Sequence, residues 1–225
     1  MKIKYPILFS FRRCPYAMRA RLAIKLCDLK CEIREISLKS KHELFLKLSP
    51  KGTVPVLVLQ DDSIIEESLE IIEWAISKQD PLNIMPKNPI AYEDDINLIK
   101  IFDNEFKFHL DRYKYSSRYG NTSPNEHKLK ARDILVKLNY ILENKKWLRG
   151  DKPSLSDISI LPFIRQYRIA NINWFDEKLD LPNIQRWVHN FINSILGWQE
   201  IIQYKNSTFS KYHTKLCNGW KTIIS

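Results

Sequence analysis

The feature that most constrains the fold of this chain is a change in its hydrophobic pattern near residue 79. Before this point, short apolar runs typical of strands alternate with segments of helical spacing. Beyond residue 90, the strong apolar patterns have helical spacing. Pro81, Pro86 and several polar residues separate the two regions. The sequence therefore predicts an α/β domain over residues 1–78, a linker over residues 79–90 and an all-helical domain over residues 91–225.

In the first domain we expect the order strand, helix, strand, helix, strand, strand, helix. The predicted elements are residues 3–9, 15–27, 31–37, 41–48, 54–59, 63–65 and 68–78. The last two strands bracket Asp61 and Asp62 as a hairpin. This order predicts a small sheet with helices packed on it.

The second region contains three apolar stripes at helical spacing, which predict the core faces of helices. The stripes are Ile96, Ile99, Phe102 and Phe106; Ile134, Leu135, Leu138, Ile141 and Leu142; and Ile184, Trp187, Val188, Phe191, Ile192 and Ile195. Ser154 precedes Asp157 by three residues, the spacing of a capping box at the start of a helix. Pro162 interrupts the pattern that follows, so we expect a kink or an early break there.

Cys14 is the strongest candidate for a reactive residue. It stands directly before Pro15, and proline favours the first position of a helix, so Cys14 should lie at or just before the helix start. The free N–H groups and the positive dipole end at that position favour a thiolate. Arg12 and Arg13 add positive charge, so we expect the pKa of Cys14 to lie below that of a free thiol. The alternative is a buried, apolar cysteine.

A second informative segment is the turn that leads into the strand predicted at residues 54–59. Pro55 stands at the strand entrance, where proline is tolerated. A cis bond there would turn the backbone of Val54 outward, so that its N–H and C=O groups could pair with an extended peptide. The alternative is an ordinary trans proline that begins an edge strand.

Together with Glu67 and Ser68 downstream, these motifs resemble the glutathione transferase superfamily. The Cys-Pro-Tyr-Ala form is similar to its cysteine-type members, such as the omega-class and glutaredoxin-like transferases. The resemblance implies an α/β plus all-α fold. The N-terminal domain would be thioredoxin-like and the C-terminal domain all-helical. It also implies that Cys14 is catalytic, that Pro55 is a cis-proline and that glutathione is a co-substrate. Val54 would hold the cysteinyl unit of glutathione, and Glu67 and Ser68 its γ-glutamyl end.

One departure from the dithiol pattern bears on mechanism. Ala17 occupies the position where dithiol glutaredoxins carry a second cysteine, so the motif holds no resolving thiol. We therefore expect a monothiol reaction, in which Cys14 forms a mixed disulfide that a second glutathione releases.

Two functions remain open. The first is a glutathione-dependent enzyme that uses Cys14 as a nucleophile, with a small-molecule or thiol-disulfide acceptor, for deglutathionylation or for conjugation. The alternative is a non-catalytic, transferase-like binding or regulatory protein with an anionic macromolecular partner, because the fold does not fix the function. The resemblance also implies a homodimer, although a monomer is equally compatible with the sequence.

The charge balance of +10 raises the question of an anionic partner such as nucleic acid or a membrane surface. The basic residues are spread along the chain, with local excess over residues 12–21 and 205–221. In the tail they interleave with Tyr204, Phe209, Tyr212 and Trp220, a pattern that can bind single strands by stacking. We favour a tail that packs these rings on the body of the protein, so we expect neither nucleic acid nor a membrane as partner.

Composition places the chain among intracellular globular proteins. Its hydrophobic content of 44% is sufficient for packed cores, and no apolar stretch approaches the length of a membrane span. The first residues lack the features of a secretory signal, so we expect a cytoplasmic location. The four cysteines suit a reducing compartment, and none has paired zinc-site spacing, so no metal is expected.

The remaining candidates are weaker. Cys27 and Cys31 are expected to be packed apolar residues, and His109 a solvated or core histidine rather than a residue of the cleft. Tyr16 and Ser10 are candidates to assist the thiol, because the resemblance implies that tyrosine or serine does so in other transferase classes. An aromatic cluster either walls the acceptor site or fills a gap between helices. Its members are Phe108, Arg112, Tyr113, Tyr115 and Tyr119.

Overall fold

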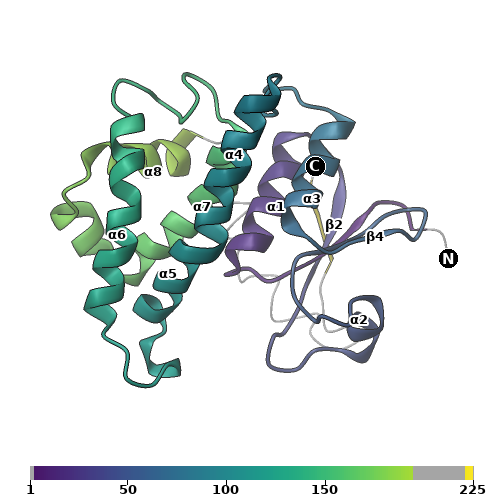
Figure 1. The fold of residues 1–225 in the computed structure, drawn as a ribbon. Helices are drawn as coiled ribbons and strands as arrows, with labels where there is room; N and C mark the ends of the chain where they lie inside the picture. Colours follow the sequence, from purple (N-terminus) through teal and green to yellow (C-terminus); the bar gives the residue numbers. More distant parts are fainter. Residues whose placement is uncertain (1–2, 195–220, 225) are drawn as a thin grey trace. The chain divides into compact units, whose positions relative to one another are not determined.

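The computed structural model describes residues 3–194 and 221–224. The chain divides into two compact units, one formed by residues 1–82 with 197–225 and the other by residues 83–196 (Figure 1). The candidate tail residues Tyr204, Phe209, Tyr212 and Trp220 lie outside the described residues.

The first unit contains a mixed five-stranded sheet in the order β4-β3-β1-β2-β5. Its strands are β1 (Ile7–Ser10), β2 (Cys31–Glu35), β3 (Val56–Val58), β4 (Ile64–Ile65) and β5 (Lys221–Ile224). Strands β1 and β2 are parallel, whereas β3 pairs antiparallel with both β1 and β4. A parallel pair needs a crossover, which helix α1 (Pro15–Leu26) provides. The other helices of this unit are α2 (Glu43–Leu48) and α3 (Ser68–Lys78), and α3 packs beside α1 (Figure 1).

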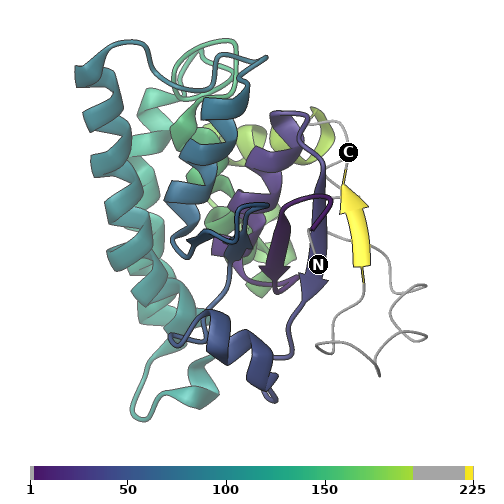
Figure 2. The same ribbon diagram turned by 90° about the vertical axis from the view of Figure 1, so that its right-hand side faces the viewer.

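Strand β5 lies in the sequence range for which only helices are predicted. It pairs antiparallel with β2, at the edge of the sheet, where Figure 2 shows it in yellow. Three of its four residues, Thr222, Ile223 and Ile224, are β-branched, a type that favours extended backbone. The edge of β2 offers unpaired backbone groups to such a segment. The segment is too short to show a periodicity in the sequence.

The core of the first unit forms where the sheet meets its helices. Phe9 of β1 and Phe45 of α2 pack with their ring centroids 5.3 Å apart. Cys14 is half-buried and packs against the edge of this cluster. The other buried members are Ile7, Ala17, Ile36, Val54, Val56 and Val58. The half-buried thiol at the border of a rigid core is therefore held in place by its neighbours.

The second unit is helical throughout its described residues. Its elements are α4 (Pro89–Ile101), the π-helical turn η1 (Phe102–Phe106), α5 (Lys107–Lys114), the 3₁₀ turn η2 (Ser116–Arg118), α6 (Pro124–Ile141), α7 (Leu155–Ala170), the π-helical turn η3 (Trp174–Lys178) and α8 (Pro182–Ser194). Helix α4, η1 and α5 follow one another without a break (Figure 1). Helices α4, α6 and α8 each begin with a proline, the residue that suits the first helical position.

The structure agrees with most of the predicted elements and corrects their ends. Helix α3 has the predicted bounds of residues 68–78, and α1 ends one residue before the predicted Cys27. The strands are shorter than predicted; β1 begins at Ile7 because Pro6 has no N–H to donate to a ladder. Of the kink or early break expected at Pro162, the early break is wrong, since α7 continues to Ala170 and buries most of its residues.

The predicted capping box at the start of α7 is confirmed. The Asp157 carboxylate accepts from Ser154 N at 2.8 Å, and Asp157 N donates to Ser154 Oγ at 3.4 Å. Asp157 Oδ1 also accepts from Leu148 N at 3.1 Å and from Trp187 Nε1 at 2.8 Å. Burial raises the pKa of Asp157 to about 6, although these hydrogen bonds act in the opposite direction. The box therefore ties the start of α7 to the preceding loop and to α8.

Candidate functional site

Cys14 occupies the N-cap of α1, with Pro15 at the first helical position, as predicted. Its backbone is extended, with φ −76° and ψ 121°, and its carbonyl accepts the first bonds of the helix, including one from Met18 N at 2.9 Å. Cys14 N donates to Phe11 O at 3.0 Å, which closes the turn before the helix. The Cys14 side chain makes no capping hydrogen bond to the N–H groups of the first turn. The Cys14 side chain therefore does not serve as the acceptor for the first turn of α1.

Val54 lies directly beside Cys14, although 40 residues separate them in the sequence. The Cys14 thiol donates to the Val54 carbonyl over 3.6 Å. The Val54–Pro55 peptide bond is cis, as the resemblance implies. Strand β3 begins one residue after Pro55 and pairs with β1, and β1 leads into the Cys14 turn. The sheet thus brings two of the predicted site residues together.

A buried arginine that the sequence analysis missed holds the turn before Cys14. Arg21 of α1 is fully buried, and its guanidinium donates to Ser10 Oγ, to Phe11 O at 3.5 Å and to Arg12 O at 3.1 Å. Ser10, which the sequence offered as a possible assistant of the thiol, is fully buried, and its hydroxyl accepts from Arg21. Arg21 lies seven residues after Cys14, two turns along the same face of the helix, which is the signal that could have identified it.

A carboxylate completes the support of this turn from the other side. The Glu35 side chain, 7% exposed at the end of β2, accepts from Arg12 N at 2.7 Å. A hydrogen bond from a backbone N–H to a carboxylate is charge-assisted and is stronger than one between two neutral groups. Together, Arg21 and Glu35 bind both the acceptor and the donor groups of the turn, so its backbone is constrained.

The start of α3 carries Glu67 at its N-cap and Ser68 at its first helical position. The Glu67 side chain is exposed to solvent, whereas Ser68 is buried. The Glu67 side chain is 63% exposed and pairs with Lys51 Nζ at 2.9 Å, and this hydrogen bond raises the pKa of Lys51. Ser68 is buried, and its hydroxyl accepts from Arg19 Nε of α1 at 3.0 Å. Arg19 also lies over the Tyr16 ring, 5.1 Å from its centroid. The Arg19–Ser68 hydrogen bond joins the second turn of α1 to the start of α3, so Ser68 is tied to the helix that Cys14 begins.

The turn that carries Lys51 depends on glycine. Gly52 has φ +61°, and a Cβ there would meet Leu46 Cδ2 at 3.0 Å and Lys41 Nζ at 3.2 Å. A side chain at this position would therefore be strained both by its backbone and by its neighbours. The glycine lets the chain reverse between Lys51 and Val54, which places the Lys51 ammonium and the Val54 backbone on one short turn.

The two other cysteines in the described residues differ sharply from Cys14. Cys27 and Cys31 are fully buried, and burial raises the pKa of each thiol to about 12. Cys31 donates to Pro6 O at 3.2 Å. Both are packed residues, as predicted. Within residues 3–194 and 221–224, no group of three or more His, Cys, Asp or Glu side chains could hold a metal ion.

The predicted aromatic cluster separates into a buried and a surface part. Tyr113 packs on Tyr167 with ring centroids 5.4 Å apart, and burial raises the pKa of its hydroxyl. The Arg112 guanidinium lies 3.5 Å from the Phe108 ring centroid and 4.6 Å from that of Tyr119. Phe108 is 47% exposed. Tyr113 therefore fills a gap between helices, whereas Phe108, Arg112 and Tyr119 form a stack at the surface of the second unit.

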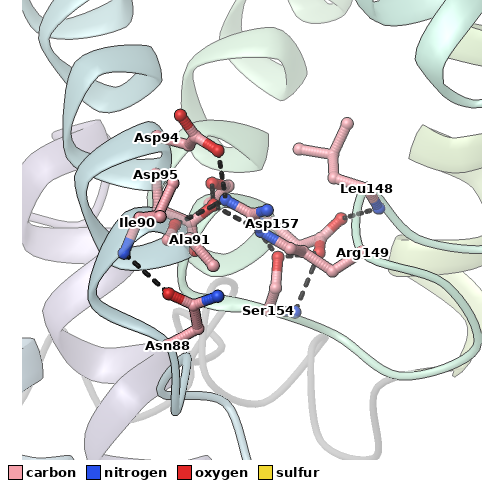
Figure 3. Close-up of polar contacts among 10 residues, drawn as sticks. Asn88, Ile90, Ala91, Asp94, Asp95, Leu148, Arg149, Ser154 and Asp157 are labelled. Atoms are coloured by element: carbon pink, nitrogen blue, oxygen red, sulfur yellow. Dashed lines mark hydrogen bonds and ion pairs between the residues drawn. The ribbon is translucent and has the colours of Figure 1, made fainter.

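A hollow of about 560 Å³ lies in the second unit, between the starts of α4 and α7. Figure 3 shows that the polar groups around it already bind one another. Arg149 Nε donates to Asp95 Oδ1 at 2.9 Å, and Arg149 Nη2 to Ala91 O at 2.5 Å. The Asn88 side chain caps α4 by accepting from Ile90 N at 2.9 Å. These contacts join helices and loops, so we assign this region to stability.

No helix among the described residues combines the length and the apolar composition that crossing a bilayer requires.

Two family models match the chain in its two regions. The model described as the glutathione S-transferase N-terminal domain matches residues 8–83, and that of the C-terminal domain matches residues 99–194. Glutathione S-transferase omega-2 from Homo sapiens is 30% identical over 186 residues, which cover 80% of this chain and 74% of the relative. Glutathione S-transferase omega-1 from Sus scrofa is 26% identical over 184 residues, with the same coverage of 80% and 74%.

Solved structures show the same fold. A glutathione transferase family member from Pseudomonas fluorescens, described with two glutathione molecules bound, has a TM-score of 0.75 at 16% identity and covers 88% of this chain and 92% of its own. The tau-class transferase of Mangifera indica has a TM-score of 0.73 at 21% identity, covering 91% and 98%. The predicted fold, a thioredoxin-like domain followed by an all-helical one, is confirmed.

Proposed function

The chain belongs to the glutathione S-transferase superfamily, and from this premise we propose that it is a glutathione-dependent thiol transferase with Cys14 as its nucleophile. The observation that carries the proposal is the contrast among its thiols. Cys14 is half-exposed at the start of a helix, whereas burial raises the pKa of Cys27 and Cys31 to about 12. A thiolate, and not a thiol, attacks disulfides, so the helix start is the favourable place for this chemistry.

The groups around Cys14 suit glutathione as co-substrate. The Val54 carbonyl lies beside the thiol, where an extended peptide would find a backbone partner. Ser68 offers a hydroxyl and Glu67 a carboxylate at the start of α3, where the γ-glutamyl end carries both an ammonium and a carboxylate. Lys51 adds a cation for a carboxylate of the tripeptide. Solved relatives whose descriptions state bound glutathione support the same assignment.

The proposed reaction proceeds by two exchanges. The Cys14 thiolate attacks the glutathione sulfur of a mixed disulfide, a Cys14–glutathione bond forms, and the acceptor leaves as a thiolate that takes up a proton. A second glutathione, as thiolate, then attacks the sulfur of glutathione bound to Cys14. Oxidised glutathione leaves and the Cys14 thiolate returns, so no external oxidant is needed. Ala17 supplies no thiol that could compete for the second step.

The first test is the intact mass of the protein after incubation with oxidised glutathione. Wild type should gain one glutathione, which reduced glutathione then removes, and Cys14→Ser should gain none at this position. Tyr16→Phe is the matched control, because it removes a neighbouring hydroxyl and leaves the thiol. A folded wild-type protein without an adduct on the Cys14 peptide would contradict the proposal, as would an unchanged adduct on Cys14→Ser.

A second measurement separates thiol transfer from conjugation. Cys14→Ser should lose the release of glutathione from a glutathionylated peptide. Conjugation of glutathione to an electrophile such as chlorodinitrobenzene does not need the Cys14 sulfur as a leaving group. A variant that keeps full thiol transfer would contradict the nucleophile assignment. The homodimer implied by the family is part of the same proposal, and sedimentation equilibrium measures it directly.

Glutathione affinity tests the remaining site residues. Ser68→Ala and Glu67→Gln should each weaken glutathione binding about tenfold, because each removes one polar partner of the γ-glutamyl end. Glu70→Gln is the control, since this carboxylate lies on the exposed face of α3 three residues further along. Equal losses in Glu67→Gln and Glu70→Gln would show a general charge effect rather than a contact.

A further inference from the structure

Two histidines from neighbouring helices of the second unit face one another. His109 lies on α5 and His127 on α6, and their Nδ1 atoms are 2.7 Å apart. The ring planes are tilted by 38°, with centroids 5.0 Å apart. Phe108 contacts both rings edge-on, at 5.1 Å from His109 and 5.7 Å from His127. Two helices that pack along one another therefore hold both imidazoles in a fixed relation.

Burial disfavours the charged form of both imidazoles. Burial lowers the pKa of His109 below its usual value, and the neighbouring His127 lowers it further. Burial also lowers the pKa of His127. The charged groups around the pair come from both helices and from the preceding π-helical turn. Glu105 and Glu126 favour the protonated forms, whereas Arg112 and Lys130 disfavour them.

We propose that His109 and His127 form a two-imidazole site for a late divalent transition ion, such as Ni²⁺ or Cu²⁺, with water as the other ligands. Neutral imidazole is a strong ligand for these ions. Because no third His, Cys, Asp or Glu completes a cluster within the described residues, water must take the remaining positions. The proposal does not depend on the glutathione site.

The spacing of the two nitrogens favours one coordination geometry. Two nitrogens each about 2.0 Å from an ion lie about 2.8 Å apart at a right angle and about 3.3 Å apart at the tetrahedral angle. The observed 2.7 Å is closer to the right-angled arrangement. Octahedral and square-planar ions therefore fit this pair with a smaller movement than tetrahedral zinc.

Binding needs a change of tautomer but no net loss of a proton. Without metal, one ring must donate its Nδ1–H to the other, because the two atoms are within hydrogen-bond distance. With metal, both Nδ1 lone pairs face the ion and both rings carry hydrogen on Nε2. The proton thus moves from Nδ1 to Nε2 of one ring through water. Acidification opposes binding, because each protonated imidazole loses its lone pair.

Calorimetric titration of the full chain with Ni²⁺ at pH 7.5 tests the proposal. Wild type should bind one ion, and His109→Asn and His127→Asn should each lose at least about tenfold in affinity, because a single imidazole cannot chelate. His189→Asn is the matched control and should retain the wild-type affinity, since His189 lies on α8 beside Asp176. The thiols are common to all four proteins, so their contribution cancels.

Several outcomes would overturn the site. These are absence of binding by wild type, unchanged affinity in either single variant, or an equal loss in His189→Asn. Circular dichroism checks that each variant is folded, and the two single variants test the pair from separate helices. In a wild-type titration repeated at pH 5, the affinity for Ni²⁺ should fall at least about tenfold, because protons compete with the ion for both nitrogens. Binding that persists there belongs to other ligands.

Discussion

The starts of α7 and α1 differ in whether the N-cap side chain accepts a hydrogen bond from the N–H groups of the first turn. The start of α7 is closed, because Ser154 and Asp157 cap each other's backbone and Asp157 also binds Leu148 N and Trp187 Nε1. The start of α1 is open, because Cys14 stands at the N-cap without a capping hydrogen bond from its side chain. At α7 the capping side chains bind backbone N–H groups of the helix start, whereas at α1 the N-cap side chain does not.

The residues that bind the neighbouring elements also lie at different positions relative to the N-caps of α7 and α1. At α7, the capping residues themselves bind the neighbouring elements. At α1, the supporting groups are not the capping residue itself: Arg21 and Glu35 bind the turn before Cys14, and the Cys14 thiol donates to the Val54 carbonyl. A half-buried thiol on a backbone that other residues hold in place is the arrangement expected of a reactive site.

The sharpest test of the contrast is Cys14→Ser. Serine is a preferred N-cap residue, so this change should remove the glutathione adduct completely and yet raise the free energy of unfolding by about 0.5–1 kcal/mol. Intact-mass analysis measures the first effect and urea denaturation the second. A destabilised variant would show that Cys14 contributes to the fold, and the contrast between open and closed starts would fail.

Asp157→Ala should have the largest effect on stability. It leaves the Leu148 N–H and the Trp187 Nε1–H buried without an acceptor and removes the cap of α7, at a cost of about 3–5 kcal/mol. Urea denaturation measures the loss. The folded fraction should still form the Cys14 adduct at the wild-type rate, since the box lies in the other unit. A destabilisation below about 1 kcal/mol would contradict the role assigned to the box.

Arg21→Met should affect both properties to an intermediate degree. The methionine fills part of the volume, but Ser10 Oγ and the carbonyls of Phe11 and Arg12 lose a buried donor, so we expect a loss of about 2–3 kcal/mol. Because the turn before Cys14 is then less constrained, the adduct should form about tenfold more slowly. Arg34→Met, a half-buried arginine of β2, is the control. Equal rate losses in both variants would show that the hydrogen bonds of Arg21 to the turn do not account for the slower adduct formation.

The stability of the protein should also depend on pH through Asp157. Its pKa in the folded protein is about 6, above the usual 3.8, so between these values the folded state binds more protons than the unfolded state. Its contribution to stability therefore rises as pH falls from about 7 to 4. Denaturation of wild type and Asp157→Asn across this range isolates the effect, because asparagine does not titrate. Parallel curves for the two proteins would show that the pKa of Asp157 is not raised.

Local sequence was sufficient for both helix starts. Cys14 before Pro15 and Ser154 before Asp157 are short-range signals, and the structure places both where they were predicted. The strand ends, in contrast, depend on partners: β5 exists because the edge of β2 is available to it. The sequence pattern also could not separate Tyr113, which packs inside, from Phe108, which is exposed, because their surroundings come from other helices.

The residues that support the candidate site were the hardest to predict. The spacing of Arg21 from Cys14 places both residues on one face of the helix, but the burial of Arg21 against the turn before Cys14 is visible only in the fold. Glu67 and Ser68 are adjacent, yet one faces solvent and the other binds Arg19 in the interior. Such differences arise from long-range packing, which no spacing rule contains.

The uncapped thiol of α1 also has a consequence for how this protein can change over generations. A single base substitution converts a cysteine codon into a serine codon, and serine satisfies the helix start better than cysteine does. Mutational drift at position 14 would therefore not be opposed by misfolding. The fold tolerates loss of the thiol, so only selection on the chemistry itself could hold the cysteine in place.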